Sequence, residues 1–158
     1  GQDLQYMDHD NQRKVTPTVI ETSVGVDRTF LAVLCKAYDE EMVEQKDGKE
    51  GESRLVLRIP AKIAPVQAAV LPLSKKLSEP AEKLFAEVGK YFRSEFDVTG
   101  SIGKRYRRQD EIGTPFCITY DFDSADDNAV TVRNRDTMEQ DRVNVTELRA
   151  YLDKKING

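Results

Sequence analysis

Four residues near the middle of the chain could bind an anionic polymer such as a nucleic acid. They follow one another at positions i, i+3, i+4 and i+7, so a helix would place all four on one face. Cationic side chains pair with phosphates or base edges, and a carboxylate accepts a hydrogen bond from a base amino group. The same spacing is also typical of a solvated charged face, so both interpretations stay open. The residues are Lys104, Arg107, Arg108 and Glu111.

Two further arginines, Arg133 and Arg135, are two positions apart in a predicted strand, and they therefore project from the same side of it. Asp110 and Asp121 occupy plausible neighbouring positions. Cations together with carboxylates suit the edges of nucleic-acid bases better than they suit phosphates, which attract cations alone. The combination of these residues favours the binding of base edges over a merely solvated surface.

A phosphate-binding loop and a metal site are both poorly supported. In the glycine-containing stretch 98–105, Val98 stands where such a loop needs its first glycine, and Arg105 replaces the required Ser or Thr. His9 is the only histidine, so the sequence has no cluster of Cys and His with metal-ligand spacing. Cys35 and Cys117 each lie in an apolar stretch, and we expect both to be buried, unbridged side chains.

The composition predicts one ordinary globular domain with an appendage. Of the 158 residues, 39% are apolar and 33% are charged, and no apolar run is long enough to span a bilayer. The net charge of −4 argues against a protein that coats nucleic acid through its overall charge, so any RNA contact must be local. The first residues lack the features of a secretory signal, and we therefore expect a cytoplasmic protein.

Apolar periodicity and turn residues predict an alternation of helices and strands. A helix should start at Val26, and the charged stretch from Glu40 to Ser53 is typical of an exposed linker. The run from Ala68 to Leu73 indicates a strand that is covered on both faces. Asn144, with Glu147 three residues later, resembles the capping box that opens a last helix. Further strands are expected over 54–59, 96–99, 116–122 and 129–135, and further helices over 78–92 and 103–112.

These elements predict the α/β class. The last two strands should form an antiparallel hairpin, whereas strands joined through helices run parallel, which gives a mixed, mostly parallel sheet. We expect roughly five strands flanked by about three helices, with a helical remnant at the N-terminus. The predicted domain organisation is 1–45 for the remnant, 46–53 for the linker and 54–158 for the main domain.

Three parts of the sequence resemble a glycyl-tRNA synthetase of the single-subunit, homodimeric kind. PTVIETSVGVDRTFLAVLCKAY, Pro17 to Tyr38, resembles the third signature motif of class II synthetases. APVQAAVLPL, Ala64 to Leu73, resembles the opening strand of the class IIa anticodon-binding domain. The most specific part is SIGKRYRRQDEIGTPFCITYDFDS, Ser101 to Ser124, followed by VTVRNRDTMEQDRV, Val130 to Val143. The resemblance covers nearly the whole chain and implies the class IIa anticodon-binding fold.

The resemblance implies that Arg28 stands where the third motif contacts ATP, with Glu21, Ser23 and Gly25 around it. The first two class II motifs, which build the dimer interface and most of the active site, have no counterpart in this sequence. We therefore expect no catalysis and no cofactor in this fragment, which should be a monomer. The implied parent enzyme is a homodimeric glycine–tRNA ligase that uses ATP and Mg²⁺.

The resemblance also implies that the main domain binds the anticodon loop of glycine tRNA, with no role for DNA or a membrane. Glycine codons begin with two guanines, so this anticodon carries two cytosines, whose amino group suits a carboxylate and whose acceptors suit Arg or Gln. The alternative is a free-standing protein-interaction or regulatory domain of the same fold. The implied base contacts are Arg108, Gln109, Glu111, Arg133 and Arg135, and the implied phosphate contacts are Lys104, Arg105 and Arg107.

Overall fold

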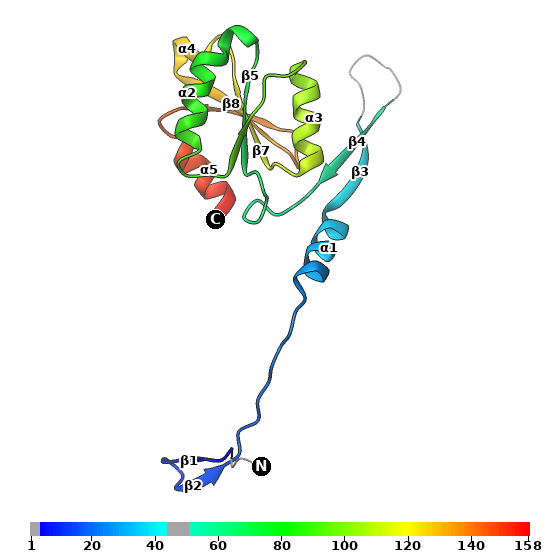
Figure 1. Cartoon of the computed structure of the whole chain (residues 1–158). Coiled ribbons are helices and arrows are strands. Elements are labelled where there is room, and N and C mark those ends of the chain that lie inside the picture. The colour runs from blue at the N-terminus through cyan, green and yellow to red at the C-terminus, as the bar shows by residue number, and fades with distance from the viewer. Residues whose placement is uncertain (1–3, 44–50) are drawn as a thin grey trace. The chain divides into compact units, whose positions relative to one another are not determined.

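The structure is a computed structural model that describes residues 4–43 and 51–158. The chain divides into two units, the first ending at Phe30 and the second beginning at Leu31. In the first unit, β1 (Tyr6–Asp8) pairs antiparallel with β2 (Arg13–Val15) (Figure 1). The carboxylate of Asp8 accepts hydrogen bonds from two main-chain N–H groups of the connecting turn, which stabilises this small hairpin.

A five-stranded sheet with the order β6-β5-β7-β8-β9 forms the centre of the second unit. Strand β5 runs parallel to β6 and β7, whereas β8 runs antiparallel to β7 and β9. Among these five strands only β8 is therefore reversed, so the predicted mixed, mostly parallel sheet is confirmed. Every residue of β5 is buried, as its continuous apolar run predicts. The strands are β5 (Ala68–Pro72), β6 (Ser94–Phe96), β7 (Phe116–Tyr120), β8 (Ala129–Asn134) and β9 (Gln140–Asn144).

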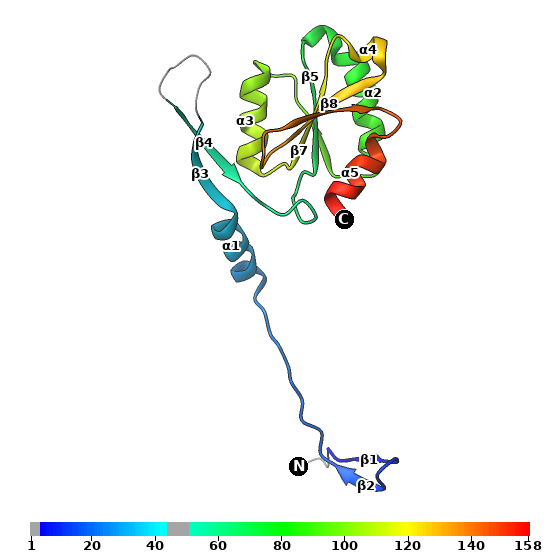
Figure 2. The ribbon, with the colours of Figure 1, turned by 180° about the vertical axis from the view of Figure 1, so that it is seen from behind.

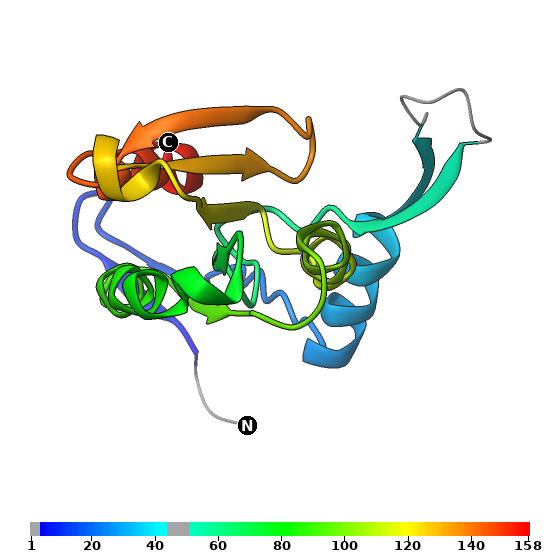
Figure 3. The same cartoon turned by 90° about the horizontal axis from the view of Figure 1, so that it is seen from above.

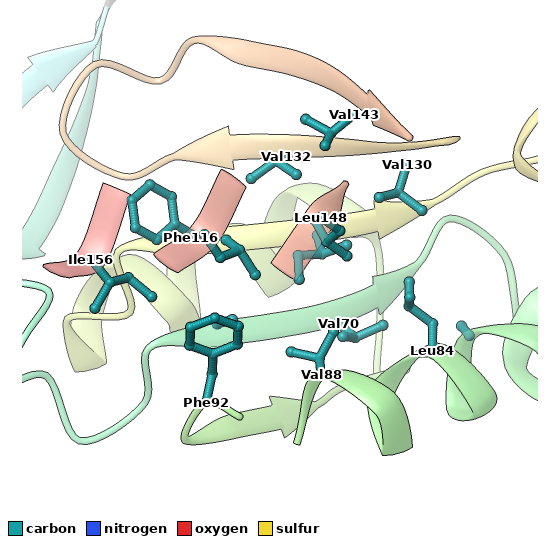
Figure 4. Close-up of a cluster of buried hydrophobic side chains, with 14 residues drawn as sticks. Val70, Leu84, Val88, Phe92, Phe116, Val130, Val132, Val143, Leu148 and Ile156 are labelled. Atoms are coloured by element: carbon teal, nitrogen blue, oxygen red, sulfur yellow. The ribbon is translucent and has the colours of Figure 1, made fainter. Parts of the chain in front are cut away.

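The main apolar core lies between one face of this sheet and two helices, α2 (Ser78–Val88) and α5 (Leu148–Asn157). A short 3-10 helix, η1 (Lys75–Leu77), leads into α2. Figure 4 shows side chains from both helices meeting those of the strands, with Leu148 of α5 among the valines of β8 and β9. Leu152 is fully buried. Burial of such a side chain stabilises the fold by about 1.5–3 kcal/mol.

Helix α3 (Ile102–Ile112) covers the opposite face of the sheet from α2 and α5 (Figures 1 and 2). The helix ends at Gly113, whose φ of 86° lies in the left-handed region that favours glycine. A Cβ at this position would lie 3.0 Å from the Cδ1 atom of Ile59, so the close packing also requires glycine. A smaller apolar cluster under α3 consists of Ile102, Tyr106, Ala69, Leu71 and Cys117.

Strands β3 (Tyr38–Val43) and β4 (Glu52–Leu57) form an antiparallel pair that we call the arm. It packs beside α3, as Figure 3 shows, and it follows directly after α1 (Val26–Ala37). The prediction of a linker is wrong for the described residues of this region, because they pair as strands. The charged side chains indicated a linker, but in the structure they form ion pairs. Residues 44–50 of the predicted linker lie outside the described residues.

Three local predictions are also wrong. Strand β9 was not predicted, because its largely polar sequence lacks an apolar pattern. The capping box is absent: α5 begins at Leu148, and the Asn144 side chain accepts hydrogen bonds within the preceding turn instead. Cys35 is exposed, whereas Cys117 is buried as expected. Burial raises the pKa of the Cys117 thiol to about 12.

Candidate nucleic-acid interface

The four residues at helical spacing form an exposed row along α3, which we call the outer row. Lys104 and Glu111 are exposed, and the side chains of Arg107 and Arg108 are 45% and 42% exposed. Arg107 forms an ion pair with Glu52 of the arm. The predicted grouping on one helix face is therefore confirmed, and solvent reaches the row along its length.

Arg108 is held by the loop that follows β6. Its Nε and one terminal nitrogen donate to Asp97 Oδ2 at 3.1 and 2.5 Å, and the same terminal nitrogen donates to the main-chain oxygen of Thr99 at 2.6 Å. Burial alone would raise the pKa of Asp97, but the N–H of Thr99 and the Arg108 guanidinium lower it below its ordinary value. Arg108 is thus oriented by a carboxylate while it remains accessible to a ligand.

The inner side of α3 carries a buried charge network that we call the Asp110 network. Asp110 is 1% exposed and accepts two hydrogen bonds from Arg133 of β8, at 2.9 and 3.1 Å. It also accepts one from Arg54 Nε of the arm, at 2.8 Å. The guanidinium of Arg133 lies 4.9 Å from the centre of the Tyr106 ring, close enough for a cation–π contact. These contacts join the helix, the sheet and the arm.

Three other residues expected to contact RNA are buried and have partners within the protein. Gln109 is 2% exposed and accepts a hydrogen bond from Thr114 at 2.6 Å. Arg135, 3% exposed, donates to the main-chain oxygens of Ile59 and Gly113, at 2.9 and 2.7 Å. Arg105, also 3% exposed, donates to the main-chain oxygen of Pro72 at 2.5 Å. The structure therefore brings these side chains close to the outer row without exposing them.

Arg54 and Arg142 belong to the same side of the molecule, and sequence reasoning missed both. Arg54 alternates with the leucines Leu55 and Leu57 in a predicted strand, and in the structure Arg54 and Val56 are the buried residues of β4. Arg142 lies on β9, a strand that was not predicted. Only the ion-pairing capacity of an arginine within a strand could have indicated either residue.

Arg142 forms a half-exposed cluster with two aspartates on the face of the sheet that α3 covers. Its side chain is 34% exposed and pairs with Asp121 and Asp127, and it donates to Thr131 Oγ1 of β8 at 3.0 Å. Burial would raise the pKa of Asp121, but the bond from Arg142 lowers it below its ordinary value. A guanidinium beside a carboxylate presents both the donor and the acceptor that a cytosine edge needs.

The residues expected to contact ATP lie in an exposed stretch of the first unit. Arg28, Glu21, Ser23 and Gly25 are all exposed. A Cβ added at Gly25 would meet no atom within 4 Å, so the glycine is not needed for a close approach of neighbouring groups here. By themselves these residues form no cradle for a nucleotide, and no chemical step can be assigned to them.

Two other kinds of site have no support within residues 4–43 and 51–158. No helix of this described part is long and apolar enough to cross a membrane. The same residues include no group of three or more His, Cys, Asp or Glu side chains placed to hold a metal ion.

Comparison with known proteins identifies the family. Residues 67–155, more than half of the chain, match the family described as anticodon binding domain. The chain belongs to the anticodon-binding domain family. This anticodon-binding domain spans α2, α3 and the whole five-stranded sheet, and it therefore includes the outer row and the buried residues Asp110 and Arg133.

The relatives agree with the sequence resemblance. The chain is 57% identical to a glycine–tRNA ligase of Lachnospira eligens and 58% identical to one of Bacillus anthracis. The matches cover 98% and 99% of this chain but only 32% and 33% of those ligases. The RNA-binding domain of threonyl-tRNA synthetase from Cryptosporidium parvum has a similar fold, with a TM-score of 0.58 and 26% identity over 62% of this chain and 25% of that one.

Proposed function

We propose that the chain recognises the anticodon loop of glycine tRNA as part of a glycine–tRNA ligase. The observation that carries the proposal is the outer row of α3, an accessible set of cations and one carboxylate inside an anticodon-binding domain. Its arginines already pair with carboxylates of the protein, which RNA phosphates or base edges can replace. The similarity to glycine–tRNA ligases supports glycine tRNA as the partner.

The contacts divide into two groups by exposure. We assign base recognition to Arg108 and Glu111 and phosphate contact to Lys104 and Arg107, because these side chains reach solvent. The other expected contacts shape the face from within, since each of these side chains is buried and makes at least one hydrogen bond inside the protein. They are Gln109, Arg133 and Arg135 for the bases and Arg105 for the phosphates.

The remaining assignments concern the whole enzyme. We propose that it is a cytoplasmic homodimer that uses ATP and Mg²⁺ to attach glycine to its tRNA. Residues 1–45 then belong to the catalytic domain and 54–158 to the anticodon-binding domain. The exposed apolar side chains Phe30 and Leu31, 63% and 60% exposed, support this division, because such residues normally pack against another part of a protein.

A titration with glycine tRNA and with a copy whose anticodon cytosines are replaced tests the proposal. We expect tighter binding to the natural anticodon at low and at physiological salt. Arg108→Ala should reduce this preference by about 1–3 kcal/mol, the range for a specific base contact. Lys104→Ala should weaken binding to both RNAs equally and lower the salt dependence.

Arg149→Ala is the matched control, because it removes one positive charge from α5 on the opposite face of the sheet. It should bind both RNAs like the unmodified chain. Equal binding of both RNAs by every variant would contradict base recognition by the outer row. No binding of either RNA would instead favour a protein-interaction domain.

A further inference from the structure

The arm is attached to α3 at two points one helical turn apart. Glu52 pairs with Arg107, and two residues further along β4 Arg54 pairs with Asp110. The first pair is half exposed, whereas Arg54 and Asp110 are 6% and 1% exposed. The spacing of the strand therefore matches that of the helix, with one contact at the surface and one in the interior.

The interior contact is part of a connection between three elements. One carboxylate, that of Asp110, is shared by Arg54 of the arm and Arg133 of β8. Arg54 also donates to the main-chain oxygen of Arg135 at 2.6 Å and pairs with Glu41 of β3. The arm is thereby bonded to the helix and to the sheet through a single guanidinium.

These buried charges make detachment of the arm unfavourable. If β4 moved away, Asp110 and Arg133 would keep one another but lose the second cation, and buried charges without partners are strongly destabilising. Burial alone would lower the pKa of Arg54, but the bonds to Asp110 and Glu41 raise it above its ordinary value. Arg54 therefore stays charged and bound as long as the arm is docked.

Asp110 lies within the outer row's own stretch of helix. Arg107 precedes it by three residues and Glu111 follows it directly. The hydrogen bonds that hold Asp110 therefore also fix the rotation and position of the outer row. At its other end the arm continues into α1, which finishes at Ala37, one residue before β3 begins. The arm thus links the RNA-binding helix to α1.

We propose that Asp110 is a positioning residue for RNA binding, which couples docking of the arm to the placement of the outer row. This inference rests on the proposed function. Coupling is reciprocal, so RNA bound on α3 stabilises the docked arm, and a docked arm strengthens RNA binding by the same factor. Arg54, which solvent scarcely reaches, then affects RNA affinity without touching the RNA.

Two measurements on the whole chain test this coupling. The first is amide hydrogen exchange of β4 with and without the anticodon stem-loop of glycine tRNA. We expect the RNA to slow exchange in β4 by about fivefold or more, the lower end of typical coupling. The second is the dissociation constant of the stem-loop for Arg54→Ala, which should rise by a similar factor while the circular dichroism stays that of the unmodified chain.

Matched variants separate coupling from general effects. Arg149→Ala removes the same charge from α5, where the Arg149 side chain lies over the ring of Tyr91, and it should leave the affinity unchanged within about twofold. Arg54→Lys keeps the cation but loses the planar donor pair that serves both Asp110 and the Arg135 oxygen, so it should weaken binding less than alanine. If Arg54→Ala does not fold, Arg54→Lys and the exchange measurement still decide the matter.

The outcomes distinguish this inference from the function on which it rests. If the unmodified chain binds the stem-loop but the arm exchanges at the same rate and folded Arg54 variants bind normally, the coupling is refuted and the proposed function stands. If the unmodified chain binds no stem-loop, both are refuted.

Discussion

Helices pack on both faces of the central sheet, but different chemistry holds the two faces. On the α2 and α5 side, aliphatic and aromatic side chains pack on one another. On the α3 side, a small apolar cluster lies next to the Asp110 network, in which Arg54 and Arg133 share one carboxylate. Apolar packing tolerates changes that keep volume, whereas a charge network depends on every partner. The polar face therefore fixes one arrangement of α3, and this is the face that carries the outer row.

Loss of Asp110 should have the largest effect on stability. Asp110→Ala leaves Arg54 and Arg133 buried without their shared carboxylate, and we expect a cost of about 3–5 kcal/mol in the free energy of unfolding. Urea unfolding followed by circular dichroism measures it. Asp110→Asn keeps the shape but not the charge and should also be strongly destabilising. A loss below about 1 kcal/mol for both variants would show that the network is not needed for stability.

A cavity on the apolar face should cost slightly less. Leu152→Ala removes a fully buried side chain from the core and should reduce the free energy of unfolding by about 2–5 kcal/mol. The matched variant Leu152→Met keeps the volume, and its cost should stay below about 1.5 kcal/mol. The comparison of the two faces would fail if Leu152→Met were as harmful as Asp110→Asn in the same urea titration.

Acid should weaken the α3 side before it affects the apolar core. The pKa of Asp97 is below its ordinary value, so its contribution to stability is complete above the unfolded-state pKa of about 3.9. That contribution is lost as the pH falls through the lower, folded-state value. The urea concentration at the unfolding midpoint should therefore decrease when the pH is lowered below about 4. Asp97→Asn should make this decrease shallower. An identical pH profile for Asp97→Asn would contradict the assignment.

The exposed pair of Arg107 and Glu52 should have the smallest effect on stability. Solvent screens it, so Glu52→Gln should change the free energy of unfolding by no more than about 1 kcal/mol. Thermal unfolding at low and at high salt measures this difference, which salt should reduce further. A cost as large as that of Asp110→Asn would mean that the surface contact attaches the arm as firmly as the buried one, which would contradict the account.

Sequence reasoning predicted the apolar face well and the polar face only in part. Alternating apolar residues and the continuous run of β5 indicate burial directly, so the α/β class and the mixed sheet are confirmed. The helical spacing of the outer row is also confirmed. The burial of Arg133 and Arg135 was not predicted, because charge alone does not show whether a partner lies in solvent, in a ligand or in the protein.

The missed strands have the same physical cause. Strands β9 and β3 are rich in charged and polar residues, which an apolar pattern assigns to loops or linkers. Their ion pairs connect residues far apart in the sequence, such as Arg142 and Asp121, and a single sequence gives no measure of such pairing. Polar strands next to a binding face are therefore the part of this fold that only the structure reveals.

The most direct test of the account is a nuclear magnetic resonance titration of the chain with the anticodon stem-loop of glycine tRNA. We predict that the resonances of Lys104, Arg108 and Glu111, with those around Arg142, shift most, and that those of α2 and α5 remain unchanged. A second titration with the anticodon cytosines replaced should give weaker shifts at Arg108 and Glu111. Shifts confined to α2 and α5, or no shifts with either RNA, would contradict the assignment of the α3 face to anticodon recognition.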